Sequence, residues 1–293
     1  MTSHDRSASW RRYSAEELDR QYDARASVPS FDAEYARYVA ASDAALRDVP
    51  RISDLCFDEK SGETLDFYSA GRMSPIFLWI HGGYWRALSK QDNAFVVPGL
   101  VSHGVSVAVM NYSLAPAVGI GEIVRQVRAA VAWLHRYGAT LGADPRRIHV
   151  GGSSAGGHLV GTLLAGGWHE TFDFPEDGIG TALALSGLHD LRPLRHTRVD
   201  GWMKFDDASL VAHSPILSVP RHASARLLAS VGGLETDEFR RQTRDYVARW
   251  RSAGNAAEEI AMPNHNHFDI ALSLGEPQGA LARAVVASIR RAA

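Results

Sequence analysis

A serine flanked by glycines near the middle of the chain could act as a nucleophile. Residues 152–156 read Gly-Ser-Ser-Ala-Gly and fit the pattern G-x-S-x-G, with Ser154 at its centre. The short stretch 147–150 predicts a strand before this motif, and residues 159–164 predict a helix after it. Glycines on both sides leave room for a sharp strand-turn-helix bend that holds the Ser154 hydroxyl clear of the sheet. We therefore predict acyl transfer through Ser154, whereas Ser153 is one position out of phase and is expected to be structural.

A glycine-rich loop could stabilise the oxyanion that such a reaction creates. Residues 81–85, His-Gly-Gly-Tyr-Trp, follow a continuous apolar run. Backbone N–H groups in such a loop are open to a substrate because glycine carries no side chain. We predict that Gly83 and Tyr84 donate from this loop, with Gly82 as the alternative. A further N–H donor is expected from Ala155, which directly follows the nucleophile.

Two late histidines are candidates for the general base. With this kind of nucleophile turn, the acid and then the base follow the serine along the chain. His265 and His267 both lie in segment 264–268, after the last predicted strand. We prefer His267, which leads directly into a helical segment through Phe268, and keep His265 as the alternative. His81 precedes the serine and is expected to shape the glycine-rich loop.

The acid that orients this base is expected after the strand predicted at residues 225–231. Glu235 and Asp237 both follow that strand. Either carboxylate could hold the imidazole and stabilise the imidazolium that forms when the serine loses its proton. Glu238 is expected instead in the first turn of the next helix, where a carboxylate complements the helix dipole. The residues alone leave Glu235 and Asp237 open.

Alternating strands and helices are expected to hold these residues in place. The predicted strands are short apolar runs at residues 52–57, 65–68, 76–80, 105–110, 147–150, 181–185, 225–231 and 259–262. The main predicted helices lie at residues 92–103, 122–141, 159–164, 238–251 and 280–291. This alternation implies right-handed crossovers and a mostly parallel sheet, and hence an α/β fold.

The chain is expected to contain one catalytic domain with two accessory segments. Residues 1–50 are rich in polar residues, with apolar ones at roughly helical spacing, and predict an N-terminal helical extension that serves as a cap. The catalytic domain then covers residues 51–293. Within it, residues 187–220 interrupt the alternation of strands and helices and predict a small cap over the site.

Aromatic residues near the predicted site could shape a substrate pocket. Trp85 closes the glycine-rich loop, and Trp202 and Phe205 lie in the predicted cap segment. We expect these side chains to bind the substrate as an aromatic wall for the acyl or leaving group. Ordinary core packing is the alternative for Trp85.

Composition excludes several other classes of protein. The 293 residues carry a formal net charge of −2 and no basic block, which argues against nucleic acid or an anionic membrane as a partner. No metal-binding motif, cysteine pair or dinucleotide fingerprint is present, so we expect neither a metal nor another cofactor. The single cysteine, Cys56, and the absence of an apolar signal segment favour a cytoplasmic protein. The expected partners are a small-molecule substrate and, at most, a second copy in a homodimer.

Four segments together resemble a known family. They are residues 81–85, 154–159, 185–191 and, late in the chain, 235–242 with 267–270. On these segments the chain resembles the kynurenine formamidase (arylformamidase) branch of the α/β-hydrolases, which is related to the hormone-sensitive-lipase-like esterases. The His-Gly-Gly-Tyr-Trp loop is fairly specific to this branch, whereas the nucleophile motif marks only the superfamily.

The resemblance implies an α/β-hydrolase fold with a triad of Ser154, an acid and His267. The family's acid is usually Asp in a segment like D-S-P-E-F-x-R-Q. Matching residues 238–242, Glu-Phe-Arg-Arg-Gln, onto that segment puts Glu235 at the acid position and leaves Asp237 as the alternative.

The resemblance also implies a reaction. The expected activity is hydrolysis of N-formylkynurenine to kynurenine and formate, a step of tryptophan catabolism. The alternative is a carboxylesterase for small short-chain esters, because both reactions need the same triad and oxyanion donors. An alternative from another class is a catalytically inactive hydrolase fold that binds a small ligand.

Overall fold

A single twisted sheet organises the chain. The computed structural model describes residues 9–291, which contain a sheet of eight strands in the order β1-β2-β4-β3-β5-β6-β7-β8. The strands are β1 (Ile52–Asp58), β2 (Glu63–Tyr68), β3 (Ser74–Ile80), β4 (Ser106–Met110), β5 (Ala143–Ser153), β6 (Ile179–Leu185), β7 (Arg226–Ser230) and β8 (Ala257–Glu259). β2 pairs antiparallel with β1 and β4, and the remaining neighbours pair in parallel. The predicted α/β fold is confirmed.

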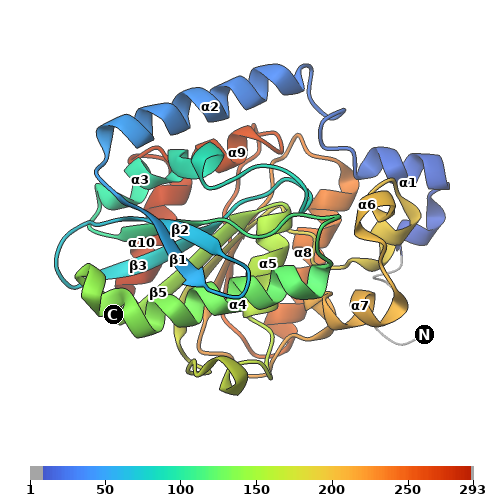
Figure 1. Ribbon diagram of the computed structural model, residues 1–293. Helices are drawn as coiled ribbons and strands as arrows, with labels where there is room; N and C mark the ends of the chain where they lie inside the picture. Colours follow the sequence, from blue (N-terminus) through green and yellow to red (C-terminus); the bar gives the residue numbers. More distant parts are fainter. Residues whose placement is uncertain (1–8, 292–293) are drawn as a thin grey trace.

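Helices cover both faces of the sheet, which explains the continuous apolar runs of its central strands. In β3, Ile76, Leu78 and Ile80 pack into one apolar cluster, while Phe77 and Trp79 pack into another. The first face is covered by α4 (Ile120–Tyr137), α5 (Ala155–Leu163) and α8 (Asp237–Ser252) (Figure 1). The second face is covered by α2 (Phe31–Asp48), α3 (Val97–Val101), α9 (Asp269–Leu272) and α10 (Ala280–Arg291).

The last strand differs from its prediction. The sequence predicted a strand at residues 259–262, but β8 covers Ala257–Glu259 and Met262 forms only an isolated bridge with Gly232. The reason lies in the neighbouring strand, where the Ser230 hydroxyl donates to the Ile260 carbonyl and so replaces a ladder bond. Residue 263 is proline, which has no N–H with which to continue the ladder. The chain therefore leaves the sheet early, toward the predicted base.

Among the described residues, two α-helices precede the sheet, on either side of the break predicted at residues 28–29. They are α1 (Ala15–Gln21) and α2 (Phe31–Asp48), and the predicted N-terminal extension also includes residues 1–8, which lie outside the described residues. Serine side chains cap both helices, Ser14 for α1 and Ser30 for α2. α2 lies across the top of the molecule in Figure 1, above α3 and α9.

The predicted cap segment, residues 187–220, folds into short helical pieces. They are η5 (Arg192–His196), α6 (Asp200–Met203), α7 (Asp207–Ala212) and η6 (Pro215–Leu217). α6 lies next to α1 in Figure 1, and the two segments are linked where Arg198 binds Asp19 with a 2.7 Å hydrogen bond. The N-terminal helices and this segment therefore meet on one side of the catalytic domain.

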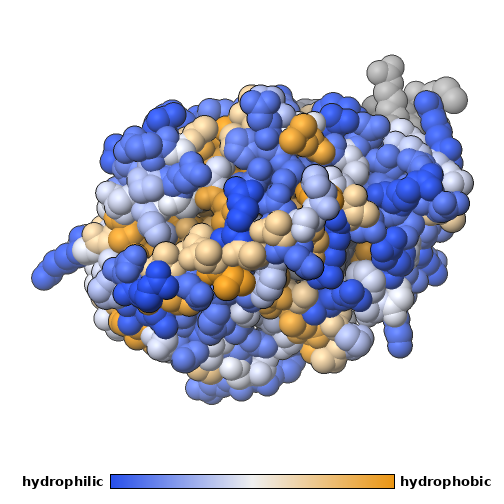
Figure 2. Space-filling model, turned by 90° about the horizontal axis from the view of Figure 1, so that it is seen from above, coloured by the Kyte–Doolittle hydropathy of each residue, from blue (hydrophilic) through white to orange (hydrophobic). Residues whose placement is uncertain are grey.

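The surface seen over α2 is mixed in character. Hydrophilic side chains predominate, and hydrophobic ones gather in a band near the middle of this face (Figure 2). The α2 residues Tyr35 and Val39 are among the exposed large hydrophobic residues. Within residues 9–291, every helix is too short or too polar to cross a lipid bilayer.

Candidate active site

Ser154 sits on a strained turn between β5 and α5. Its backbone angles are φ 57° and ψ −116°, a region that non-glycine residues rarely occupy. The turn is possible because Gly152 and Gly156 approach other backbone closely: a Cβ on Gly156 would lie 2.0 Å from the Ile80 carbonyl oxygen, and one on Gly152 would lie 2.5 Å from Gly156. The Ser154 N–H donates to the Leu185 carbonyl at 2.8 Å. The predicted strand-turn-helix bend is thus held by backbone contacts with the neighbouring strands.

The structure brings His267 and Glu235 together. His267 Nδ1 lies 2.6 Å from Glu235 Oε2, and both side chains are buried. The other carboxylate oxygen, Oε1, accepts hydrogen bonds from the Ser186 hydroxyl at 2.6 Å and from the Gly232 N–H at 2.7 Å. The carboxylate is therefore fixed on one side, and its remaining oxygen holds the imidazole in one orientation.

The alternative acid and base lie elsewhere. The Asp237 side chain is 68% exposed and pairs with Arg240 at 2.5 Å. It begins α8, so it occupies the first-turn position rather than the loop that faces His267. His265 is only partly buried, and its backbone carbonyl accepts a hydrogen bond from the Leu234 N–H. The contact between Glu235 and His267 therefore favours these two residues over both alternatives.

The glycine-rich loop adopts a backbone that exposes its donors. Gly83 has φ +97°, and a Cβ there would lie 2.2 Å from the Ala87 carbonyl oxygen, so only glycine fits. Tyr84 follows with φ 50°. Among residues 9–291, no hydrogen bond uses the N–H groups of Gly83, Tyr84 or Ala155. A Cβ on Gly82 would lie 3.4 Å from Ser154 Cβ, which places the loop beside the nucleophile. These N–H groups are free to bind an oxyanion.

His81 supports the loop from behind, as its predicted structural role requires. Its Nδ1–H donates to the Gly82 carbonyl at 2.8 Å, and its ring stacks on Tyr112 with centroids 4.1 Å apart. The side chain is fully buried, and burial lowers the pKa of His81 to about 4. The ring is therefore neutral at pH 7.

A pocket of about 220 Å³ joins these parts. Ser154 and His267 border it together with Gly83, Tyr84 and Trp202 of the predicted site. Trp202 is oriented by a 3.2 Å hydrogen bond from its indole N–H to the Tyr84 carbonyl. Among the described residues, no group of three His, Cys, Asp or Glu side chains is arranged to hold a metal ion.

The expectation that Trp85 and Phe205 form a wall of this pocket is wrong. Trp85 is fully buried, Phe205 is 5% exposed, and neither borders the cavity. Trp85 has φ 57°, and its indole packs edge-on against His158 at 5.1 Å and against Phe205 at 6.3 Å. The glycine-rich loop thus turns Trp85 into the core beneath the site, and Trp202 is the tryptophan that reaches the pocket.

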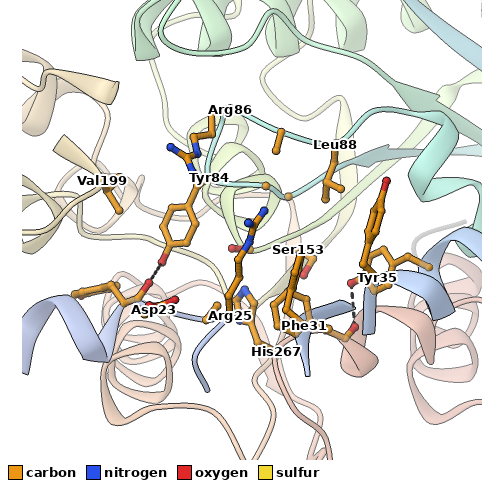
Figure 3. A pocket seen from close by; sticks show the side chains of 18 of the residues that line it. Asp23, Arg25, Phe31, Tyr35, Tyr84, Arg86, Leu88, Ser153, Val199 and His267 are labelled. Atoms are coloured by element: carbon orange, nitrogen blue, oxygen red, sulfur yellow. Dashed lines mark hydrogen bonds between the residues drawn. The ribbon is translucent and has the colours of Figure 1, made fainter. Parts of the chain in front are cut away.

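Much of the pocket lining comes from residues that no motif in the sequence indicates. The N-terminal segment contributes Tyr22, Asp23, Ala24, Arg25, Phe31, Tyr35 and Tyr38. Figure 3 labels four of them, Asp23, Arg25, Phe31 and Tyr35. These residues lie more than a hundred positions before Ser154, so no local motif connects them to it. The one available signal was the helical spacing of tyrosines in that segment, which indicates a face packed against something. Ser186, which holds Glu235, was also missed.

A family model and curated relatives match this chain. The family model described as BD-FAE matches residues 65–179. Kynurenine formamidase of Danio rerio is 29% identical over 275 residues, which cover 89% of this chain and 92% of the relative. Kynurenine formamidase of Salmo salar is 30% identical and covers 73% and 74% of the two chains. The chain belongs to the kynurenine formamidase family. The chain is therefore an enzyme of the α/β-hydrolase class.

More distant similarities extend to esterases. Esterase LipQ of Mycobacterium tuberculosis is 27% identical over 70% of this chain and 52% of its own length. Among solved structures, a putative thioesterase from Silicibacter superposes with a TM-score of 0.80 at 28% identity, covering 94% of this chain and 99% of that one. An esterase from Pyrobaculum calidifontis, 16% identical, covers 99% of each chain with a TM-score of 0.72 and shows the shared fold.

Proposed function

We propose that this enzyme hydrolyses N-formylkynurenine to kynurenine and formate. The observation that carries the proposal is the similarity to a curated kynurenine formamidase across 89% of the chain. The pocket supports it chemically, because a serine on a strained turn, a histidine paired with a buried carboxylate and unused N–H donors border one cavity. These are the parts that acyl transfer needs.

The first half of the reaction forms a formyl-enzyme. His267 takes the Ser154 proton through Nε2 as the hydroxyl oxygen attacks the formyl carbon. The resulting oxyanion is stabilised by the free N–H groups of Gly83, Tyr84 and Ala155. Glu235 stabilises the imidazolium through Nδ1–H. The C–N bond then breaks, and His267 donates its proton to the departing aryl amine.

The second half releases the acid. A water molecule takes the place of the amine, and His267 accepts a proton from it as the water oxygen attacks the formyl ester. The same N–H groups stabilise the second oxyanion. Collapse of this intermediate breaks the bond to Ser154 Oγ, returns the proton to that oxygen and releases formate.

Ester hydrolysis is the second candidate function. The similarity to esterase LipQ of Mycobacterium tuberculosis favours it, and the same residues could cleave an ester. An inactive, ligand-binding protein is the third alternative, and the intact pair of Glu235 and His267 beside Ser154 speaks against it. Labelling with a fluorophosphonate tests that alternative directly, since an inert pocket should not react.

The deciding experiment follows N-formylkynurenine by absorbance with the wild type and with Ser154→Ala. We expect turnover by the wild type and a loss of roughly 10³-fold or more in kcat for the variant, because the nucleophile is absent. Short p-nitrophenyl esters serve as the comparison substrates. Much faster Ser154-dependent turnover of the esters would replace the formamidase assignment by an esterase.

We also propose that the enzyme works in the cytoplasm on a small-molecule substrate. The single cysteine, Cys56, supports this location because it leaves no internal disulfide to form. Cell fractionation tests the location. Sedimentation at several protein concentrations tests the proposed homodimer, whose presence would make the apparent mass rise with concentration.

A further inference from the structure

A short turn of the N-terminal segment forms one wall of the pocket. It comprises residues 22–27, between α1 and α2, and it is held at several points. The Tyr84 hydroxyl donates to the Tyr22 carbonyl, and Arg198 of the cap segment pairs with Asp23 at 2.8 Å. Asp23 Oδ1 also accepts from the Ala26 N–H at 3.2 Å. The backbone of this turn is therefore fixed over the active site.

The turn presents Arg25 to the pocket. The Arg25 guanidinium carbon lies 4.1 Å from the centroid of the Phe31 ring, and Phe31 packs in turn against Phe268, next to His267. Stacking on a ring occupies the face of the guanidinium but leaves its N–H groups at the edge. Between residues 9 and 291, no hydrogen bond or ion pair involves the Arg25 side chain. Figure 3 shows it extending into the middle of the pocket.

The charge of the pocket is also unbalanced. Three arginines border it, Arg25, Arg86 and Arg198, against one aspartate, Asp23. Asp23 and Arg198 pair with each other, so Arg25 and Arg86 keep their positive charge without a carboxylate partner among the described residues. Arg86 stacks on Trp202 at 3.9 Å and lies at the rim beyond Tyr84 in Figure 3. Arg25 is thus the better placed of the two to meet a substrate.

We propose that Arg25 is a specificity residue that binds a carboxylate on the leaving group of the substrate. The planar edge of a stacked guanidinium suits a carboxylate, which can accept two parallel hydrogen bonds from it. The preferred substrates are then aryl formamides or aryl esters whose departing part carries a carboxylate away from the scissile bond. This inference rests on the hydrolase function proposed for Ser154 and deepens it.

The test uses two matched esters that do not depend on formamidase activity. They are 3-(4-acetoxyphenyl)propanoate and the neutral 3-(4-acetoxyphenyl)propanamide. We expect the wild type to prefer the carboxylate, and Arg25→Met to lower kcat/KM for it about 10- to 100-fold, mainly through KM, because a charge-assisted bidentate contact is lost. In the same variant, kcat/KM for the neutral propanamide ester should change by less than about twofold. Arg25→Lys should restore part of the preference.

Arg11→Met is the matched control. Arg11 belongs to the same N-terminal region and stacks on Trp10 at 5.2 Å, but it does not border the pocket. The Arg11→Met substitution should leave kcat/KM for both esters unchanged. An equal loss on both esters in Arg25→Met, or no preference in the wild type, would overturn the proposal. Because the esters report on Ser154 chemistry alone, the result stands even if N-formylkynurenine is not a substrate.

Discussion

At the scale of single residues, the geometry around Glu235 explains why this carboxylate, and not that of Asp237, faces the His267 imidazole. Glu235 is 3% exposed, and its Oε1 is already saturated by Ser186 and Gly232, so only Oε2 faces the imidazole. A carboxylate held in this way favours the His267 tautomer with its proton on Nδ1. In the proposed mechanism, that tautomer leaves Nε2 free to accept the Ser154 proton.

Glu235→Gln should therefore impair catalysis without unfolding the protein. The amide has nearly the same shape and its oxygen can still accept from Ser186 and Gly232, but it no longer stabilises the imidazolium. We expect kcat to fall by about 10³- to 10⁴-fold with a small change in KM. Steady-state kinetics on the substrate that the wild type turns over would measure it.

Asp237→Asn is the control for that variant. Its carboxylate is exposed and pairs with Arg240, an interaction of the kind that contributes little to stability. Activity should stay within about twofold of the wild type. The assignment of the acid would have to move to Asp237 if this variant, rather than Glu235→Gln, lost its activity.

At the scale of elements, a buried polar network attaches the N-terminal segment to α8. The Tyr22 hydroxyl donates to Glu238 Oε2 at 2.7 Å and accepts from Gln242 Nε2 at 3.0 Å. Close by, the Thr236 hydroxyl donates to the Gln21 carbonyl at 2.6 Å. Glu238 follows Glu235 by three residues, so the helix that begins directly after the Glu235 loop also anchors the pocket wall.

Tyr22→Phe should loosen this attachment. The substitution keeps the ring but leaves a buried amide and a buried carboxylate each short of one partner, which costs about 1–3 kcal/mol of unfolding free energy. Urea unfolding would measure the loss. Tyr35→Phe is the matched control, because its hydroxyl binds Asp92 at an exposed position and its removal should cost less than about 0.5 kcal/mol. Equal losses in the two variants would contradict the role of the network.

The elements that could be predicted are those whose signals are local. The nucleophile turn and the glycine-rich loop depend on glycines within a few residues, and a strand covered on both faces shows as an apolar run. Trp85 could not be placed from sequence, because the left-handed backbone of the loop decides whether its indole faces the pocket or the core. The end of β8 likewise depends on a hydroxyl of β7.

The pocket wall could not be predicted because its contacts span almost the whole chain. Tyr38, on α2, donates to the Phe268 carbonyl, and Asn266 donates to Glu34, also on α2. Tyrosines at helical spacing indicate that α2 covers something, but the sequence does not say what. The sequence left Glu235 and Asp237 open for a similar reason. Both follow the same strand, and only the three-dimensional path of the loop decides which carboxylate reaches His267.

At the scale of the whole molecule, the fold buries several histidines that do not border the pocket. Burial lowers the pKa of His149 and of His158 to about 3 each, and lowers that of His189 well below its usual range. His149 Nδ1 accepts the Thr181 N–H at 3.0 Å between neighbouring strands, which requires an unprotonated nitrogen. Together with His81, these rings must be neutral in the native state.

Stability should therefore depend on pH well above the acid range of the carboxylates. An unfolded histidine has a pKa of about 6.5, so below that pH the unfolded chain binds protons that the native state rejects. This stability is present above about pH 6.5 and falls with pH toward about 3 for His149 and His158 and about 4 for His81, each buried histidine costing about 1.4 kcal/mol at pH 5.5. Guanidinium unfolding of His149→Gln at pH 7.5 and 5.5 should show a drop smaller by that amount than the wild type, because glutamine can accept the Thr181 N–H without titrating. His196→Gln, at an exposed position, is the control. Identical drops in the wild type and His149→Gln would mean that proton binding to His149 does not contribute to acid unfolding.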